Sequence, residues 1–287
     1  MIETDLDKLL QEPHAYTLQR DFLQCVGPDA GDFLQGQLSQ DIEGLSDFSS
    51  AWSFLLNPNG KFCTWLRITR LSSEEYMLDT EQGFGQAALE RLNRFKIRIN
   101  CDIRNTQSQI VRILGIGARE AKGQSHKQRI VADVGWQNLE GFDLLGPDIA
   151  KPDRCREGNE NDYEYIRVFH GVPKMGLELT ESVIPAETNL VSRGVSFTKG
   201  CYTGQELVAR LDSRGNNVAK HLRKISSSGT CVVGSEITVE GKKVGVVTSA
   251  VPSGDGSIGL GYVSRSLEIP GIAEIDGFSA SITSASD

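Results

Sequence analysis

The strongest constraint on the fold lies in residues 51–70, where two apolar runs flank a short turn sequence. Residues 51–56 and 61–70 are rich in aromatic and aliphatic side chains, and the sequence Asn-Pro-Asn-Gly stands between them. Asn-Gly between two such runs is typical of a β-hairpin, because both residues tolerate the left-handed backbone that a tight turn needs. The sequence therefore predicts antiparallel β-structure early in the chain.

Helical and strand-like patterns alternate around this hairpin. Apolar side chains recur at helical spacing in residues 29–38 and 85–95, and Asp29 is placed to cap the first of these two helices. A third helix is predicted at residues 163–170, ending at Gly171 after a connection rich in proline, glycine and charge. Such an order indicates an α+β fold. Strands are predicted at residues 16–27, 74–79, 99–104, 110–116, 130–134 and 142–145.

The C-terminal part of the chain has a different character. Residues 225–283 are dense in glycine, serine, threonine and valine, which predicts short strands separated by turns and hence a small β-barrel. We expect residues 1–215 to form the α+β region, with a further division near residues 110–160 left open, and residues 216–287 to form the barrel. The predicted barrel strands lie near residues 231–232, 237–239, 244–251, 257–263 and 273–275.

Composition and charge limit the classes of function. The chain has 287 residues and a formal net charge of −8, whereas general binders of nucleic acid or of anionic membranes usually carry a basic surface. We therefore expect no direct nucleic-acid partner and no membrane partner. No apolar run approaches the ~20 residues of a membrane span, and the acidic start without a targeting pattern predicts a cytoplasmic location.

The cysteines and histidines are dispersed along the chain. No two cysteines form a C-x-x-C pair, a pattern that fits free thiols in a reducing cytosol better than a disulfide framework or a zinc site. We expect no permanently bound metal. The residues concerned are Cys25, Cys63, Cys101, Cys155, Cys201 and Cys231, with His14, His126, His170 and His221.

One of these cysteines stands in a distinctive setting. Cys201 lies two residues after Lys199 and just before a helix predicted at residues 204–212, where Thr203 and Glu206 have the spacing of a capping box. The positive end of the helix dipole and the lysine ammonium both favour a thiolate. The alternative is a small buried hydrophobic residue, which is the commonest role of a lone cysteine.

The sequence around this cysteine resembles that of a known family. Residues 199–206 have the sequence Lys-Gly-Cys-Tyr-Thr-Gly-Gln-Glu, which is similar to the signature of the YgfZ family, folate-binding relatives of the glycine-cleavage T-protein (aminomethyltransferase). The resemblance implies a T-protein-like α+β region with antiparallel sheets, followed by the barrel. Further segments that resemble the family are residues 33–41, 57–61, 167–178 and 184–190.

The same resemblance implies a function. It indicates a tetrahydrofolate-binding protein that supports the assembly or repair of iron-sulfur clusters in client enzymes, including tRNA-modifying enzymes, with iron-sulfur client or assembly proteins as partners. Cys201 is the implied functional thiol and Lys199 the group that activates it. A flat folate that ends in carboxylates needs aromatic rings, amides and basic side chains. The candidate folate-binding residues are Tyr163, Trp52, Trp65, Gly200, Tyr202, Gly204, Gln205, Glu206, Arg210 and Arg214, of which Tyr163 is alternatively a core aromatic.

The chain departs from the T-protein pattern at one point. T-protein relatives carry adjacent acidic residues where this chain has Thr64 and Trp65, neither of which can act as a general base toward a folate nitrogen. We therefore expect no aminomethyl transfer and no conventional enzyme. Two alternatives stay open: a folate-dependent one-carbon transferase that uses Asp41 or Glu206 as its base, and a scaffold that holds a protein partner through the barrel without any ligand.

Overall fold

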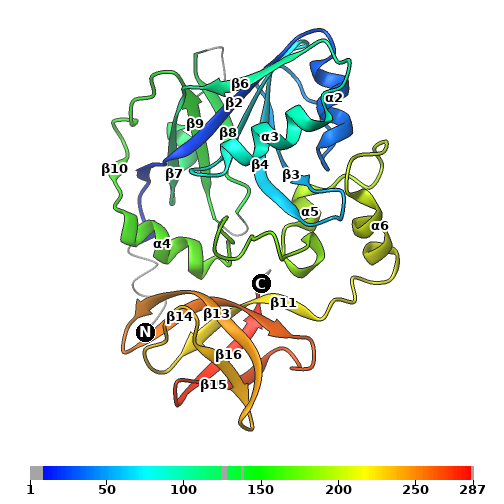
Figure 1. Cartoon of the computed structure of the whole chain (residues 1–287). Helices are drawn as coiled ribbons and strands as arrows, with labels where there is room; N and C mark the ends of the chain where they lie inside the picture. The colour runs from blue at the N-terminus through cyan, green and yellow to red at the C-terminus, as the bar shows by residue number, and fades with distance from the viewer. Residues whose placement is uncertain (1–8, 124–127, 137–138, 286–287) are drawn as a thin grey trace.

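The strands of the described residues form two five-stranded sheets and one closed barrel (Figure 1). The computed structural model describes residues 9–123, 128–136 and 139–285, so the expectations for the acidic start and for His126 lie outside the described residues. The α+β class with antiparallel sheets and a C-terminal barrel, which the sequence predicts, is confirmed.

The first sheet contains the predicted hairpin and is antiparallel throughout. The hairpin is confirmed, because β3 pairs with β4 on either side of the turn, where Gly60 adopts a φ of +79°. Helices α2 (Ala30–Gln37) and α3 (Gly85–Phe95) share an apolar core with this sheet. In spatial order the strands are β3 (Ser50–Leu56), β4 (Phe62–Ser72), β5 (Glu75–Glu81), β2 (Arg20–Val26) and β6 (Asp102–Thr106).

The segment that was predicted as one long strand forms two strands, one in each sheet. The chain leaves β1 (His14–Thr17) in the second sheet and enters β2 in the first sheet at Arg20, so the prediction of a single strand over residues 16–27 is wrong. Apolar alternation continues through the crossing and does not reveal where a chain changes sheet. In spatial order the strands of the second sheet are β10 (Arg156–Glu157), β1, β7 (Gln109–Leu114), β9 (Gly141–Gly146) and β8 (Ile130–Asp133), and only the β1–β10 pair is parallel.

Helix α4 (Glu160–Phe169) lies between the sheets and the barrel (Figure 1). It begins three residues earlier than predicted, because the side chain of Asn159 accepts the N–H of Asp162 (3.0 Å) and caps the helix. Its predicted stop is confirmed, since Gly171 adopts a φ of +67°. The short elements η1 (Ala118–Ala121), η2 (Pro185–Glu187) and α5 (Val191–Gly194) and the helix α6 (Gln205–Ser213) complete the helical part.

The C-terminal barrel closes through the pairing of its first and last strands. The predicted strand at residues 231–232 is wrong, because these residues lie in a loop, and the first strand of the barrel begins at Lys220. The division into domains at residue 216 stays a prediction. Around the barrel the strands are β11 (Lys220–Ser227), β14 (Gly256–Ser264), β13 (Lys242–Ser253), β12 (Glu236–Val239), β15 (Gly271–Ile275) and β16 (Phe278–Ser284).

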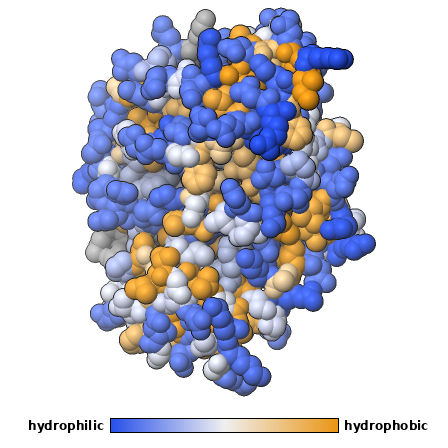
Figure 2. Space-filling view, viewed as in Figure 1, coloured by the Kyte–Doolittle hydropathy of each residue, from blue (hydrophilic) through white to orange (hydrophobic). Residues whose placement is uncertain are grey.

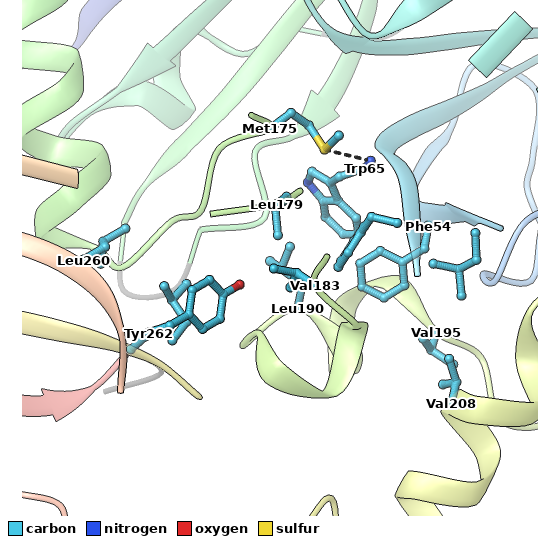
Figure 3. Close-up of a cluster of buried hydrophobic side chains, with 14 of the residues drawn as sticks. Phe54, Trp65, Met175, Leu179, Val183, Leu190, Val195, Val208, Leu260 and Tyr262 are labelled. Atoms are coloured by element: carbon cyan, nitrogen blue, oxygen red, sulfur yellow. Dashed lines mark hydrogen bonds between the residues drawn. The ribbon is translucent and has the colours of Figure 1, made fainter. Parts of the chain in front are cut away.

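A shared hydrophobic core joins the barrel to the rest of the chain. Figure 3 shows Leu260 and Tyr262 of the barrel on one side of this cluster and Phe54 with Val208 on the other. The Tyr262 hydroxyl also donates to the carbonyl of Glu178 (2.9 Å). The barrel therefore covers apolar surface of the N-terminal region, and this burial favours one fixed arrangement of the two parts.

The surface is mainly hydrophilic on the face that Figure 2 shows, where apolar residues form small separate patches. Within the described ranges, no helix combines the length and the apolar character that crossing a membrane requires. The large apolar side chains that are exposed are Ile97, Ile116, Leu177, Phe197, Val232, Val233, Ile272 and Phe278.

Candidate functional site

A buried network of ion pairs ties the two sheets together. Arg67 donates to Asp79 of its own sheet (2.9 Å) and to Asp143 of the second sheet (2.6 Å). Arg112 donates to both oxygens of Asp143 (2.7 and 2.8 Å), and Arg20 donates to Asp79 (2.5 Å). Each carboxylate therefore holds two guanidinium groups, and all five side chains are almost fully buried.

This network predicts loss of stability in acid. Burial alone would raise the pKa of Asp143, but Arg112 and Arg67 outweigh it and lower that pKa to about 2. Because the folded-state pKa lies below the ordinary value near 4, its stabilisation is complete above pH 4. We expect about 2 kcal/mol to be lost as the pH falls from 4 to 2. Urea unfolding across this range measures the loss, and Asp143→Asn should flatten the curve; equal pH dependence in both proteins would contradict the prediction.

A cleft of about 440 Å³ lies beside this network, between the two sheets and α4. All three aromatic residues predicted for the ligand slot line it: Trp52, Trp65 and Tyr163. The indoles of Trp52 and Trp65 stack with their centroids 5.2 Å apart and their planes at 8°. The volume lies within the 300–1,000 Å³ of typical small-molecule sites, and these rings give the cleft an aromatic wall.

Polar groups on the cleft wall are mostly already paired. Arg112 donates to the hydroxyl of Tyr163 (2.9 Å), and the Glu81 carboxylate accepts the N–H of Met175 (2.5 Å). Arg193 differs, because no carboxylate of the described residues lies within 4.0 Å of its guanidinium group. Burial lowers the pKa of Arg193, and the charge of Asp133 opposes this effect. Arg193 is therefore a partly buried cation that can receive an anionic ligand group.

The loop between α5 and α6, residues 195–204, carries Cys201 and packs against the end of α2. The N–H groups of Ser196 and Thr203 donate to the carbonyls of Ser39 and Gly36 (3.0 and 3.1 Å). Cys201 itself is exposed, so the alternative of a buried cysteine is wrong. Two segments far apart in sequence, residues 33–41 and the loop, thus form one surface, with the thiol facing solvent.

The ammonium of Lys199 is directed to α2. It donates to the carbonyls of Gln35 (2.6 Å), Leu38 (2.7 Å) and Gln40 (3.0 Å), which lie at and just beyond the C-terminal end of this helix. Burial lowers the pKa of Lys199 to about 8, so the group is mainly protonated at neutral pH. The ammonium satisfies helix-end carbonyls and fixes the loop, a role that the sequence did not indicate.

The start of α6 differs from the prediction. Gly204 is the N-cap with a φ of +87°, no side chain caps the helix, and the capping box of Thr203 with Glu206 is therefore wrong. The side chain of Gln205 instead accepts the N–H of Tyr202 (3.0 Å). A Cβ at Gly204 would lie 2.7 Å from the carbonyl oxygen of Asn57 in the hairpin turn. Only glycine therefore fits this close approach of loop and hairpin.

The structure separates the predicted site residues into two regions. Lys199, Cys201 and the seven other candidates of the loop and α6 do not line the cleft. Tyr202 is buried in the core cluster that also contains Phe54 and Trp65, and this core lies between the regions. The other six are Gly200, Gly204, Gln205, Glu206, Arg210 and Arg214, and a role for any of them in folate binding stays a prediction.

Helix α5 connects the two regions. Arg193 of this helix lines the cleft, while its carbonyl accepts the side-chain N–H of Gln40 (3.0 Å). The next carbonyl, of Gly194, accepts the hydroxyl of Ser39 (2.5 Å). The backbone segment of Ser39 and Gln40 in turn receives the Lys199 ammonium and the loop. One continuous set of hydrogen bonds therefore runs from the cleft wall to the loop of Cys201.

Sequence reasoning missed several residues of the cleft wall. Tyr16, Glu81, Arg112, Trp136 and Arg193 all line it, and they come from five separate segments. No spacing in the sequence relates them. The signals that were available were an aromatic or a charged residue within a mainly apolar segment, and these are too common to single out a site.

Comparison with known proteins supports the fold and the family assignment. None of the protein-family models matches the chain. A tRNA-modifying protein YgfZ from Enterobacter sp. (strain 638) is 27% identical over 262 residues, which are 81% of this chain and 79% of that protein. Proteins of the same name from Vibrio atlanticus and Klebsiella pneumoniae are 24% and 25% identical. These similarities support the assignment of the chain to the YgfZ family.

Two longer proteins match this chain over part of their own length. The mitochondrial iron-sulfur cluster assembly factor IBA57 homolog of Phaeosphaeria nodorum is 30% identical, and the match spans 68% of this chain and 51% of that protein. A putative chloroplastic transferase of Arabidopsis thaliana is 37% identical over 85% of this chain and 63% of its own length. The glycine cleavage aminomethyltransferase T of Bartonella henselae superimposes with a TM-score of 0.83 over 99% and 89% of the two chains at 18% identity, which establishes the T-protein-like fold.

The departure from the T-protein pattern has a structural counterpart in this chain. Thr64 is buried and its hydroxyl bonds to that of Thr80 (2.6 Å), while Trp65 forms part of the cleft wall. The two bases considered for a one-carbon transferase, Asp41 and Glu206, are exposed and do not line the cleft. A transferase that depends on either of them in this cleft is therefore not favoured.

Proposed function

We propose that this protein binds tetrahydrofolate in the cleft and supports the assembly or repair of iron-sulfur clusters in client enzymes, including tRNA-modifying enzymes, with Cys201 as the functional thiol. The observation that carries the proposal is the arrangement of a stacked indole pair and an arginine without an ion pair in one cleft, with a solvent-facing cysteine on a loop connected to it. The relatives named as a tRNA-modifying protein and as an iron-sulfur cluster assembly factor support the cluster role.

The side chains that line the cleft offer the chemical groups that a folate needs. Trp52, Trp65 and Tyr163 offer apolar ring surface for a flat heterocycle, and Arg193 offers a charge-assisted hydrogen bond for a carboxylate. Tetrahydrofolate, when bound, supplies nitrogen atoms that carry one-carbon units. The chain offers no carboxylate at Thr64 or Trp65 to activate such a nitrogen, so we propose a binding role for the cleft and no aminomethyl transfer.

The exposed thiol supports a role toward a protein partner. Cys201 is held at the surface by a loop whose backbone is fixed on α2, so another protein can reach its sulfur without unfolding this one. The described residues contain no group of three or more histidine, cysteine, aspartate or glutamate side chains that could hold a metal. We propose that the Cys201 thiol takes part transiently in the cluster or persulfide chemistry of a client or assembly protein.

The location is proposed on chemical grounds. All six cysteines are free thiols, as in proteins of a reducing compartment, and we propose the cytoplasm. We propose no nucleic-acid partner and no membrane partner, because the net charge of −8 opposes both.

The folate assignment is tested by calorimetric titration with tetrahydrofolate. We expect binding to the wild-type protein, and a 10- to 100-fold weaker affinity for Arg193→Met, because a charge-assisted hydrogen bond contributes roughly 1.5–3 kcal/mol. Methionine keeps an apolar stem of similar length and removes the charge. Arg119→Met is the matched control, since Arg119 is exposed and outside the cleft. Absence of binding to the wild-type protein at high micromolar tetrahydrofolate would remove the ligand from the proposal.

A further inference from the structure

The Glu81 carboxylate in the cleft wall has one oxygen that is accessible and has no partner. Its Oε2 atom accepts the N–H of Met175 (2.5 Å). No other residue that the structure describes donates to the carboxylate or places a cation within 4.0 Å of it. The side chain is partly exposed, and Oε1 is not among the unpaired polar atoms that are closed off from solvent. A molecule in the cleft can therefore reach Oε1.

The neighbours of Glu81 place its carboxylate inside the cleft. Glu81 is the last residue of β5, stands opposite Arg20 in the β2–β5 pair, and lines the cleft. The cations whose charges act on it are Arg20, Lys174 and Arg167, and all three line the same cleft. Met175, which donates to Oε2, lines it too. The groups that surround the carboxylate are thus the groups that a bound ligand would meet.

The carboxylate of Glu81 lacks hydrogen-bond donors. Burial raises the pKa of Glu81, whereas the charge of Arg20, the N–H of Met175 and the charge of Lys174 lower it. A carboxylate that is partly removed from water is stabilised by donors to both of its oxygens, and here only Oε2 has one. An N–H group of a ligand would supply the second. Arg20 and Lys174 would repel a cationic donor, so an uncharged N–H group fits best.

Glu81 and Arg193 reach the cleft from different strands of the first sheet. Glu81 ends β5, while α5, which carries Arg193, packs against β3. Strand β4 lies between β3 and β5. Because Thr80 pairs with Leu66, the next residues on the two strands, Glu81 and Trp65, come side by side. A ligand that contacts both Glu81 and Arg193 therefore spans the strand that carries Trp65.

We propose that Glu81 recognises the N–H edge of the cleft ligand by accepting, at Oε1, a hydrogen bond from an uncharged amino or ring N–H group. This inference rests on the proposed function, since it assigns the heterocyclic end of a folate to Glu81 and the carboxylate end to Arg193. Flat ligands whose edge offers only acceptors would meet the lone pairs of Oε1 and be rejected. Glu81 thereby selects among flat rings, which the apolar contact of the aromatic wall does not.

The substitution Glu81→Gln tests this role with little change in shape. The amide oxygen of glutamine can still accept the N–H of Met175, and its NH₂ group then takes the place of Oε1, so that a donor faces the donor of the ligand. We expect the melting temperature without ligand to stay close to that of the wild type. The dissociation constant for tetrahydrofolate, measured by calorimetry, should rise about 10- to 100-fold, as the loss of a hydrogen bond to a charged group predicts.

The matched control is Glu187→Gln. Glu187 is also a partly buried carboxylate whose Oε2 accepts a backbone N–H, that of Ile184 (3.3 Å), but it does not line the cleft. This variant should leave the dissociation constant for tetrahydrofolate unchanged.

Three outcomes would count against the role of Glu81. Unchanged or tighter binding by Glu81→Gln, with tetrahydrofolate binding to the wild type intact, would overturn this role and leave the folate assignment in place. A fall of the melting temperature together with the affinity would show that Glu81 acts on the fold and not on the ligand. Failure of the wild type to bind tetrahydrofolate would overturn both the role of Glu81 and the folate assignment.

Discussion

Replacement of Asp143 by alanine is expected to lower the free energy of unfolding by about 3–5 kcal/mol, as is usual when one partner of a buried ion pair is removed. Asp143 accepts hydrogen bonds from Arg67 and Arg112 and is fully buried. Without Asp143, the guanidinium group of Arg112 keeps its hydrogen bond to the Tyr163 hydroxyl, and that of Arg67 keeps its ion pair with Asp79. The two sheets then lose the charged contact that joins them beside the cleft.

The measurement is urea unfolding at neutral pH, followed by circular dichroism. The matched control is Asp102→Ala, because Asp102 also pairs with an arginine, Arg104 (3.6 Å), but both side chains are more than 60% exposed. Exposed pairs contribute little, so this variant should stay within about 0.5 kcal/mol of the wild type. A similar, small loss in both variants would show that the buried network does not hold the sheets together.

Replacement of Cys201 by alanine is expected to remove the biological activity while leaving the fold intact. The side chain is exposed, and surface substitutions of this kind usually change stability by less than about 0.5 kcal/mol. Cells that carry only the Cys201→Ala protein should lose the activity of iron-sulfur enzymes under oxidative stress, down to the level of cells without the protein. The content of tRNA nucleosides modified by cluster-dependent enzymes should fall with it.

The control for this experiment is Cys63→Ala, which removes a thiol that is not fully buried and lies on β4, outside the loop. Cells with Cys63→Ala should behave like the wild type. If cells with Cys201→Ala keep full iron-sulfur activity at equal protein level, the thiol has no part in the function. Retained tetrahydrofolate binding by the purified Cys201→Ala protein is also expected, because the loop lies outside the cleft.

The sequence was sufficient for the elements with strong local signals. The helix at residues 85–95 has the predicted bounds, since its apolar residues recur at the helical period, and the Asn-Gly turn determined the hairpin. The signature around Cys201 indicated the family, and the dense turns after residue 225 indicated the barrel. Each of these features depends on residues that are neighbours in the chain, and patterns of that kind can be recognised from one sequence.

Only the tertiary structure shows that the predicted site residues lie in two regions, the cleft and the loop of Cys201. Lys199 is two residues from Cys201, but its ammonium contacts α2, because the unpaired carbonyls at the end of that helix attract it. Arg193 and Tyr16 lie 177 positions apart (193 − 16) and reach one cleft. Burial, unpaired polar groups and contacts between distant segments arise only when the sheets pack, so no local pattern carries them. The sequence alone determined the elements with strong local signals and indicated the family, and the packing determined which side chains share a cavity.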